Sequence, residues 1–348
     1  MSLFTSHQHR ACPGHAFGEF GCASWEALSL FLRDADYYSI RYTAFWHYSY
    51  SLHVIDSTVP AGYATLMLII FTDLDGTLLD YESYSYDAAR PALAIIKDMG
   101  IPLVLVTSKT RAEVEVWRER LDNHDPFIVE NGGALYLPRK YFPFTLQAPA
   151  YRDGYAVIEF GTPYGELVDT LRAASSESQC SVIGFHDMSI QEVSLRCGIS
   201  MDLAVLAKRR EYDEPFEILD PGADQLLKCI ESRKKQWTRG GRFYHILGPN
   251  DKSHCVRLLT HFYERAFGEV STVGLGDGLN DTRFLKAVDI PIVLKSAESA
   301  RLLARVPRAR QTELPGSEGW NHAVLEILQN HGNHRVEPMP ADSSIQSA

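Results

Sequence analysis

The feature that most constrains the fold is a series of short, unbroken apolar runs that are partly β-branched. They cover Leu68–Phe71, Ile101–Val106, Phe127–Val129, Val270–Leu275 and Ile290–Leu294. Runs of this length without polar alternation are typical of strands buried on both faces, as in a parallel sheet. Helical stretches lie between them, one of which begins with the capping-box pattern Thr110-Arg-Ala-Glu113. The sequence therefore predicts a doubly wound α/β domain.

The middle of the chain, residues 148–241, interrupts this alternation. Its predicted elements are strands at Ala156–Phe160 and Pro215–Leu219, and helices that begin at Thr162-Pro163, at the capping box Ser189-Ile-Gln-Glu192 and at Met201. A mixed order of this kind favours an α+β insertion, which divides the core domain into a first half, residues 67–147, and a second half, residues 242–330.

The two ends of the chain do not fit this pattern. Residues 1–66 are rich in His, Tyr, Ser and Trp, and strand-like sequence begins abruptly at Met67. Either they form a real appendage or the biological start is Met67; we favour an over-extended start, because the rest makes a complete fold without them. Their many aromatic residues argue for the appendage, since a solvated tail seldom carries so many. Residues 331–348 are polar and are expected to form a flexible tail.

Composition argues against several classes of function. The formal net charge of −10 disfavours nucleic acid as a partner, which would need a basic patch. The longest strongly apolar run, Ala64 to Phe71, is far shorter than the roughly 20 residues that span a bilayer, and we expect no signal peptide. The six cysteines form no CxxC pair. Scattered thiols of this kind are typical of a reduced, cytoplasmic protein.

The strongest functional signal is the segment Phe71-Thr-Asp73-Leu-Asp75-Gly-Thr77. Its two carboxylates point the same way at the carboxyl end of a buried strand, which is where open parallel sheets bind ligands. Asp277 also follows a predicted strand, and Asp281 lies one turn into the next helix. Four carboxylates at one edge would repel one another without a cation. They make a hard oxygen site that suits Mg²⁺.

Two further segments bring phosphate-binding groups to the same edge. Thr107-Ser108-Lys109 follows the strand at Ile101–Val106, so a hydroxyl and backbone N–H groups can hold phosphoryl oxygens there. Lys252 begins a helix, and its cation could neutralise phosphate and aspartate together, although a lysine considered alone is usually solvated.

These residues resemble the motifs of the haloacid dehalogenase-like hydrolase superfamily. In chain order, the matching residues are Asp73 with Asp75, then Thr107, then Lys252, then Asp277 with Asp281. The resemblance covers residues 67–328. It implies a Rossmann-like core with a cap domain inserted between the second and third motifs, and the insertion found here has that position.

The insertion itself resembles the cap of a narrower family, the mannosyl-3-phosphoglycerate phosphatases. The matching patterns are Ala207-Lys-Arg-Arg210-Glu-Tyr-Asp-Glu214-Pro-Phe216, Gly184-Phe-His-Asp-Met-Ser189, Glu130-Asn131-Gly132-Gly133 and Gly241-Arg-Phe-Tyr-His-Ile-Leu-Gly248. Thr107-Ser-Lys-Thr110 also agrees with the form that this motif takes in that family. Residues 1–66 have no counterpart in the family, so the resemblance says nothing about them.

The resemblance implies an Mg²⁺-dependent phosphoric monoester hydrolase that forms an aspartyl-phosphate on Asp73. Asp75 would act as general acid and then as general base, while Thr107 and Lys252 stabilise the transferring phosphoryl group. The metal would be held by Asp73, the Asp75 backbone carbonyl and Asp277, with Asp281 orienting a metal-bound water.

The implied substrate is a glycosyl-3-phosphoglycerate, with mannosyl-3-phosphoglycerate favoured, and the product is a glycosylglycerate, a compatible solute. The expected substrate contacts are Ser108, Lys109, Glu130, Asn131, Gly132, Arg210, Glu214 and Asn250. The fork of Arg210 suits a carboxylate or phosphate, unless it is an exposed helix-end arginine that pairs with Glu211 or Glu214. Glu130 and Asn131 would bind sugar hydroxyls, unless they only build a turn with the glycines that follow. His186, His245, His254 and His261 are expected to be structural.

Other readings stay open at this point. A phosphatase of another sugar phosphate, or a phosphosugar mutase, would use the same nucleophile and metal. A binding protein with a relic site is disfavoured, because no catalytic carboxylate is missing. The expected partner is a small phosphorylated sugar-glycerate, with neither nucleic acid nor membrane. The sequence leaves open the sugar, its anomeric configuration and the oligomeric state.

Overall fold

The structure is a computed structural model that describes residues 66–146 and 150–333. Residues 1–65 of the expected extension and residues 334–348 of the expected tail lie outside the described residues, so those two expectations are not addressed. Within the described ranges, no helix has both the length and the apolar character needed to cross a membrane.

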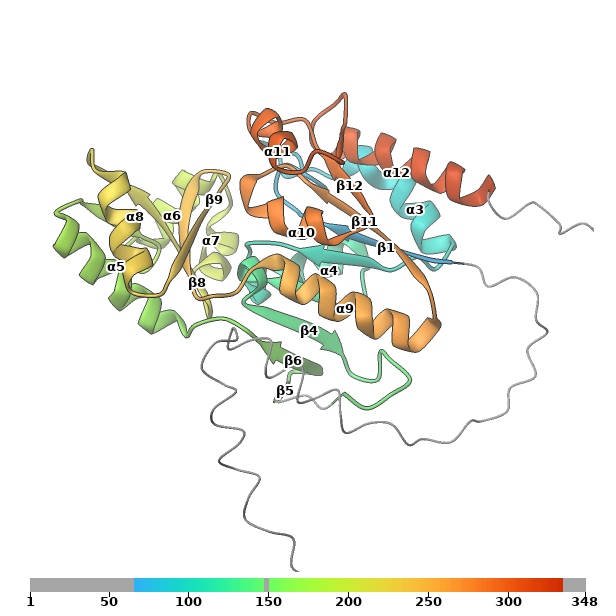
Figure 1. Cartoon of the computed structure of the whole chain (residues 1–348), viewed down its shortest axis with the longest axis horizontal. Helices are drawn as coiled ribbons and strands as arrows, with labels where there is room; N and C mark the ends of the chain where they lie inside the picture. Colours follow the sequence, from blue (N-terminus) through green and yellow to red (C-terminus); the bar gives the residue numbers. More distant parts are fainter. Residues whose placement is uncertain (1–65, 147–149, 334–348) are drawn as a thin grey trace, which may run out of the picture. The chain divides into compact units, whose positions relative to one another are not determined.

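Nine strands form the larger sheet, in the order β13-β12-β11-β1-β2-β3-β4-β6-β5 (Figure 1). Neighbours from β13 to β3 run parallel, and β4, β6 and β5 continue the sheet antiparallel. The strands are β1 (Met67–Thr72), β2 (Leu103–Val106), β3 (Phe127–Val129), β4 (Ala134–Pro138), β5 (Ala150–Arg152), β6 (Tyr155–Glu159), β11 (Val270–Gly276), β12 (Ile290–Val293) and β13 (Arg310–Gln311). All five predicted runs are strands of this one sheet, which confirms the doubly wound core.

Helices cover both faces of this sheet because alternate side chains of each strand point to opposite sides. In β1, Leu68 and Ile70 join the apolar cluster on one face, and Ile69 and Phe71 join the cluster on the other. The first face carries α3 (Arg90–Asp98), α4 (Arg111–Leu121) and α12 (Gly316–Asn333); the second carries α9 (Lys252–Phe267), α10 (Thr282–Ala287) and α11 (Ser299–Arg305). The predicted capping box of α4 is present, since Thr110 and Glu113 bond each other's backbone N–H groups.

A second sheet of four antiparallel strands, in the order β7-β8-β10-β9, lies in the insertion. Its elements are α5 (Tyr164–Ser178), β7 (Val182–Gly184), α6 (Ile190–Cys197), α7 (Met201–Ala207), β8 (Asp213–Ile218), α8 (Ala223–Ser232), β9 (Gln236–Gly240) and β10 (Phe243–Leu247). Helices α5 and α8 pack together and share an apolar cluster with Phe216 and Ile246 of the sheet. We call residues 162–247 the cap.

The sheet membership of three strands differs from the sequence expectation. Strands β5 and β6, whose residues were expected in the insertion, join the larger sheet, and β10, whose residues were expected in the core's second half, pairs with β8 in the cap. Local pattern identifies such short strands but not their partners, because pairing is decided by contacts distant in sequence. We therefore propose that the insertion runs from about residue 162 to about residue 247, rather than over 148–241.

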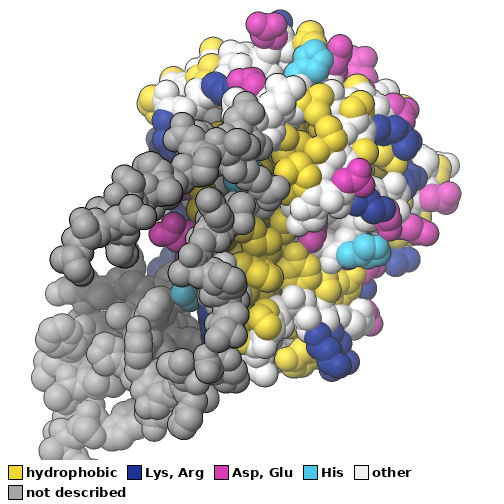
Figure 2. All heavy atoms as spheres, turned by 90° about the vertical axis from the view of Figure 1, so that its right-hand side faces the viewer, with side chains coloured by type: hydrophobic (Ala, Val, Ile, Leu, Met, Phe, Trp, Pro, Cys, Tyr) yellow, Lys and Arg dark blue, Asp and Glu magenta, His cyan; other side chains and the backbone are white. Residues whose placement is uncertain are grey.

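The two ends of the parallel strands in the larger sheet carry different kinds of residue. At the amino ends of β1, β11 and β12, Leu66, Phe267 and Ile290 are 41%, 52% and 36% exposed. Figure 2, which looks at the side where β1 begins, shows apolar side chains gathered in the middle of that face. The acidic residues of the predicted site follow the opposite, carboxyl ends of β1 and β11.

Candidate active site

Three strand ends bring the predicted catalytic residues to one edge. Asp73 follows β1, Thr107 follows β2 and Asp277 follows β11. The β1 and β11 strands are paired in parallel through Thr72 and Leu275, and the Asp73 N–H donates to the Leu275 carbonyl at 2.9 Å. This ladder therefore places residues some two hundred positions apart side by side.

The carboxylates form one compact acidic cluster. Asp73, Asp277 and Asp281 each offer an oxygen, and these three oxygens lie within 4.8 Å of one another. Burial raises the pKa of Asp73 to about 7, with Asp281 and Asp75 adding to the rise and Lys252 opposing it. Burial also holds the pKa of Asp277 well above its usual range, and the charges of Asp281 and Asp73 act in the same direction. Like charges this close favour a cation among them.

Lys252 is the cation that this cluster already contains. Its Nζ lies 2.9 Å from Asp73 Oδ1 and 2.6 Å from Asp281 Oδ1, and its side chain is 1% exposed. The lysine is the first residue of α9, and the Asp251 carboxylate caps that helix through the Ser253 N–H at 2.7 Å. Lys252 is thus a fixed part of the site and not a solvated surface residue.

The turn after β11 is held by contacts specific to its sequence. Asp281 Oδ2 accepts the N–H groups of Asp277 and Gly278 at 3.0 and 3.1 Å. Thr77 donates to Asp277 Oδ1 at 3.1 Å. Gly76 has φ +73°, and a Cβ there would lie 2.6 Å from Asp277 Oδ2, so this position requires glycine. Asp281 therefore fixes the orientation of Asp277 as well as contacting Lys252.

Asp75 lines a cavity and lies beside a second buried cation. Lys109 Nζ lies 3.0 Å from Asp75 Oδ1 and 3.7 Å from Glu113 Oε1. Thr107, which is fully buried, accepts the Lys109 N–H at 3.2 Å through its hydroxyl oxygen. The Thr107-Ser108-Lys109 segment thus forms a local turn directly after β2, closed by this hydrogen bond.

The cavity lies between the core and the cap. From the core it is lined by Asp73, Asp75, Tyr81, Tyr84, Ser108, Lys109, Asp277 and Asn280, among others. From the cap it is lined by Phe185, Arg210, Pro215, Arg242, Phe243 and His245, among others. The core side of the cavity therefore carries the acidic groups and Lys109, and the cap side carries two arginines beside an apolar and aromatic surface.

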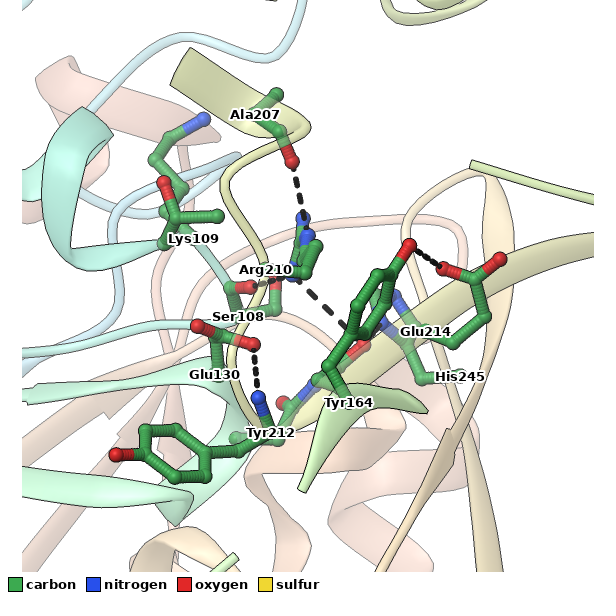
Figure 3. Close-up of polar contacts among 12 residues, drawn as sticks. Ser108, Lys109, Glu130, Tyr164, Ala207, Arg210, Tyr212, Glu214 and His245 are labelled. Carbon is green, nitrogen blue, oxygen red and sulfur yellow. Dashed lines mark hydrogen bonds and ion pairs between the residues drawn. The ribbon is translucent and has the colours of Figure 1, made fainter. Parts of the chain in front are cut away.

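Arg210 projects from the cap toward the motif after β2 (Figure 3). Its Nη1 donates to the Ser108 carbonyl at 2.7 Å, and its Nε donates to the Ala207 carbonyl at 3.0 Å. Its guanidinium lies 3.7 Å from Asp213, and its side chain is 5% exposed. The alternative of an exposed arginine paired with Glu211 or Glu214 is wrong, because the end of α7 packs against the core here.

Of the other predicted substrate contacts, Ser108 and Lys109 line the cavity, whereas the remaining five are engaged within the protein and are absent from its described lining. Glu130 accepts the N–H groups of Glu211 and Tyr212 (Figure 3). Asn131 donates to Asp213 at 2.6 Å. Glu214 accepts a hydrogen bond from the Tyr164 hydroxyl at 2.6 Å, and the Asn250 side chain donates to the Asn131 carbonyl at 3.4 Å. Gly132 packs against the Asp251 backbone, since a Cβ at this position would lie 2.2 Å from the Asp251 carbonyl oxygen. Glu130 and Asn131 therefore join the core to the cap, whereas the other three residues make contacts within one of the two parts.

Several cavity residues escaped the sequence analysis. Tyr81 and Tyr84 follow the first acidic motif, and the Tyr84 hydroxyl donates to the Cys197 carbonyl of the cap at 3.1 Å. Arg242 lies over the Tyr81 ring at 5.1 Å. His245, expected to be only structural, lines the cavity. Both Arg242 and His245 belong to the Gly241–Gly248 pattern, which the sequence analysis had matched to a family without assigning a site to it.

Comparison with known proteins agrees with this geometry. Residues 70–144 match the haloacid dehalogenase-like hydrolase family model. The chain is 42% identical over 271 residues to a glucosyl-3-phosphoglycerate/mannosyl-3-phosphoglycerate phosphatase of Methanococcoides burtonii, covering 76% of this chain and 98% of that protein. It is 33% identical over 232 residues to a mannosyl-3-phosphoglycerate phosphatase of Pyrococcus horikoshii, covering 66% of this chain and 92% of that protein.

The fold has relatives among solved structures as well. A phosphatase of the haloalkanoate enzyme superfamily from Bacteroides thetaiotaomicron matches with a TM-score of 0.54 at 20% identity, covering 79% of this chain and 98% of that one. At this identity the likeness concerns the fold alone. Sequence identity, fold and site together show that the chain is a phosphoric monoester hydrolase of the haloacid dehalogenase-like superfamily and belongs to the family of the glucosyl-3-phosphoglycerate/mannosyl-3-phosphoglycerate phosphatases.

Proposed function

We propose that this phosphatase hydrolyses a glycosyl-3-phosphoglycerate, with Mg²⁺ as cofactor and an aspartyl-phosphate on Asp73 as intermediate. The observation that carries the proposal is the meeting of Asp73, Asp277 and Asp281 within 4.8 Å at the carboxyl ends of β1 and β11. A covalent mechanism of this kind needs a nucleophilic carboxylate beside a metal site, and Asp73 belongs to that cluster.

The donor set fits a hard divalent cation. All three groups are carboxylates, and crowding by their neighbours contributes to the raised pKa values of Asp73 and Asp277. Such oxygen ligands select Mg²⁺ over softer metals. We assign Asp73, Asp277 and the Asp75 backbone carbonyl as ligands, with Asp281 supporting them. Bound Mg²⁺ would screen the phosphate's negative charge so that an anionic nucleophile can approach.

The protein groups divide the chemistry between two half-reactions. Asp73 forms a bond to phosphorus as the bond to the glycerate oxygen breaks, and Asp75 donates a proton to that leaving oxygen. Water then attacks the phosphorus of the aspartyl-phosphate, Asp75 takes a proton from that water, the bond between phosphorus and Asp73 breaks, and inorganic phosphate leaves. Lys252 is 2.9 Å from Asp73, so its ammonium can stabilise charge on the transferring oxygens. Thr107, which follows β2, would stabilise charge on the same oxygens through its hydroxyl.

The charges along the cavity suit a substrate with more than one anionic group. Lys109, Arg210 and Arg242 line it in addition to the acidic cluster, and Arg210 still has N–H donors beyond the two bonds described above. A phosphate at the metal end and a carboxylate nearer the arginines would use both sets of cations. The two relatives compared above act, by their names, on glucosyl- or mannosyl-3-phosphoglycerate, whose acid portion has both groups.

Phosphate release tests the substrate and the reaction class together. The purified chain with Mg²⁺ is given mannosyl-3-phosphoglycerate, glucosyl-3-phosphoglycerate and a set of hexose phosphates. We expect the glycosyl-3-phosphoglycerates to be hydrolysed most efficiently, without any bisphosphate activator. A requirement for such an activator, with no net phosphate release, would identify a mutase instead.

The covalent step is tested by Asp73→Asn, which keeps the size of the side chain but removes the nucleophile. We expect the turnover number to fall by about ten-thousandfold. Acid quenching with substrate labelled in its phosphate should leave label on the peptide that contains Asp73 in the unmodified enzyme alone. Asp87→Asn is a matched control, because the Asp87 side chain is 73% exposed and lies outside the site. Retention of turnover by Asp73→Asn would rule out the intermediate.

A further inference from the structure

The strand β10 presents His245 to the substrate cavity. Tyr244 and Ile246 pack into the apolar cluster shared with α5 and α8. Because successive side chains of a strand point to opposite faces, Phe243 and His245 lie on the other face. Both line the cavity, as does Pro215, the partner of His245 in the β8–β10 ladder. The side chain of His245 is 5% exposed, so it is surrounded by protein groups and not by solvent.

Asp213 fixes the ring of His245. The Nδ1 atom lies 2.8 Å from Asp213 Oδ1, and Asp213 is completely buried. Burial alone would raise the pKa of Asp213, but His245, Arg210 and the Asn131 amide outweigh it and hold that pKa below its usual range. Asp213 is therefore a carboxylate that accepts a hydrogen bond, which assigns a proton to Nδ1. The ring atom that remains for a ligand is Nε2.

The position of His245 in the cavity indicates which part of a ligand it meets. The acidic cluster and Lys109 are on the core side, whereas Phe185, Phe243 and Pro215 line the cap side with His245, and Arg210 and Arg242 line the cap side as well. An uncharged portion of the substrate suits those apolar walls, and the anionic portion suits the cations. A hydroxyl can donate to Nε2 when the ring is neutral and accept from it when the ring is charged.

A chain of hydrogen bonds connects this pair to the catalytic edge. Asn131 donates to Asp213 Oδ2 at 2.6 Å, and Asn280 donates to Asn131 Oδ1 at 3.2 Å. Asn280 lies in the turn that carries Asp277 and Asp281. Groups of the core as well as the cap therefore help to fix the orientation of the His245 ring.

We propose that His245 binds a hydroxyl of the substrate's sugar and that Asp213 is the positioning residue that holds the His245 ring. This contact would make the enzyme prefer glycosylated substrates over 3-phosphoglycerate itself. This inference rests on the proposed function, because it assumes a sugar in the cavity. It gives His245 a role in binding, and it assigns the sugar to the cap side of the cavity.

The test compares two variants that separate the nitrogens of the ring. His245→Asn keeps an amide near Nδ1, so Asp213 retains a donor, but it removes the group at Nε2. His245→Gln places its amide near Nε2 and loses the Asp213 contact. For each, the measured quantity is the ratio of kcat/KM for mannosyl- or glucosyl-3-phosphoglycerate to that for 3-phosphoglycerate. Where 3-phosphoglycerate turns over too slowly, its competitive inhibition constant replaces its kcat/KM.

We expect His245→Asn to lower this ratio about tenfold or more, mainly through KM, and His245→Gln to lower it less. His186→Asn is the matched control, since His186 is an exposed cap residue and the ratio should stay within about twofold of the unmodified enzyme. Thermal melting identifies which variants fold, and either folded variant decides the question. An unchanged ratio, including one in which both substrates lose activity equally, overturns the role of His245. If the unmodified enzyme hydrolyses neither glycosyl substrate, the proposed function itself fails.

Discussion

Lys109 Nζ lies 3.0 Å from Asp75 Oδ1, in a position where its side chain is only 8% exposed. The lysine also contacts Glu113, which is the N3 residue of the α4 capping box. The first turn of α4 therefore fixes a cation against the residue that we assign as general acid and base. The Thr-Ser-Lys-Thr order after β2 supplies the lysine and the N-cap of this arrangement.

Replacing Lys109 by methionine should destabilise the protein by about 3 kcal/mol, because it leaves Asp75 and the buried Glu113 without their cation. The free energy of unfolding in urea measures this loss. Lys97→Met is the matched control: its partner is Asp122, and the two side chains are 67% and 59% exposed. An exposed pair of this kind should cost less than about 1 kcal/mol. Equal losses in the two variants would contradict the buried contact.

Gly76→Ala should impair metal binding, since the added Cβ would lie 2.6 Å from Asp277 Oδ2 and must displace that carboxylate, which we propose as a metal ligand. We expect kcat/KM to fall at least about a hundredfold and the Mg²⁺ concentration for half-maximal activity to rise. Gly100→Ala is the control, because Gly100 has a similar φ of +65° but open space around its Cβ. It should lose only about 1 kcal/mol of stability and keep its Mg²⁺ response. A similar loss of activity in both would show that backbone strain, not Asp277, is responsible.

Magnesium should stabilise the chelator-treated protein against heat, because it binds carboxylates that repel one another only in the folded state. At about a hundred times its Kd, the stabilisation should be about 3 kcal/mol, seen as a rise in Tm. Asp277→Asn should abolish this rise, whereas Asp153→Asn, in a side chain that is 70% exposed, should keep it. A Tm that does not respond to Mg²⁺ in the unmodified protein would remove the metal from the proposal.

The parts of the fold that sequence predicts well are those determined locally. The run at Leu68–Phe71 is apolar on every residue because both faces of β1 are buried, and the capping boxes of α4 and α6 need only residues three positions apart. The sheet to which β6 and β10 belong was not predicted correctly, because it is decided by the partner strand and not by the strand's own sequence pattern.

The same division applies to the site. Asp73 and Asp277 were predictable since each directly follows a buried strand, and parallel strands end at one edge. His245 and Arg242 reach the cavity only because the cap approaches the core, which no local pattern encodes. Glu130 shows the converse error: a polar residue at a strand end was predicted to contact the substrate, yet its carboxyl group accepts the backbone N–H groups of Glu211 and Tyr212.

Glu130 has an unusual titration because it is completely buried at this junction. Burial raises its pKa from 4.5 to about 8; Arg210 and the two backbone N–H donors oppose the rise, and Asp213 adds to it. In the unfolded chain this carboxyl loses its proton near its ordinary pKa. Between these two pKa values the folded state binds more protons, so the free energy of unfolding must fall as the pH rises.

Glu130→Gln removes this dependence, since glutamine does not titrate and its amide oxygen can still accept the N–H groups of Glu211 and Tyr212. Relative to the unmodified protein, the variant should therefore gain about 2–4 kcal/mol of stability between about pH 5 and about pH 9. Urea unfolding at both pH values measures the difference. Glu119→Gln, at an exposed position of α4, should differ from the unmodified protein by less than about 0.5 kcal/mol at either pH. A Glu130→Gln difference that does not change with pH would mean that Glu130 is ionised in the folded state throughout this range. In that case the N–H groups of Glu211 and Tyr212 would donate to a buried, negatively charged carboxylate.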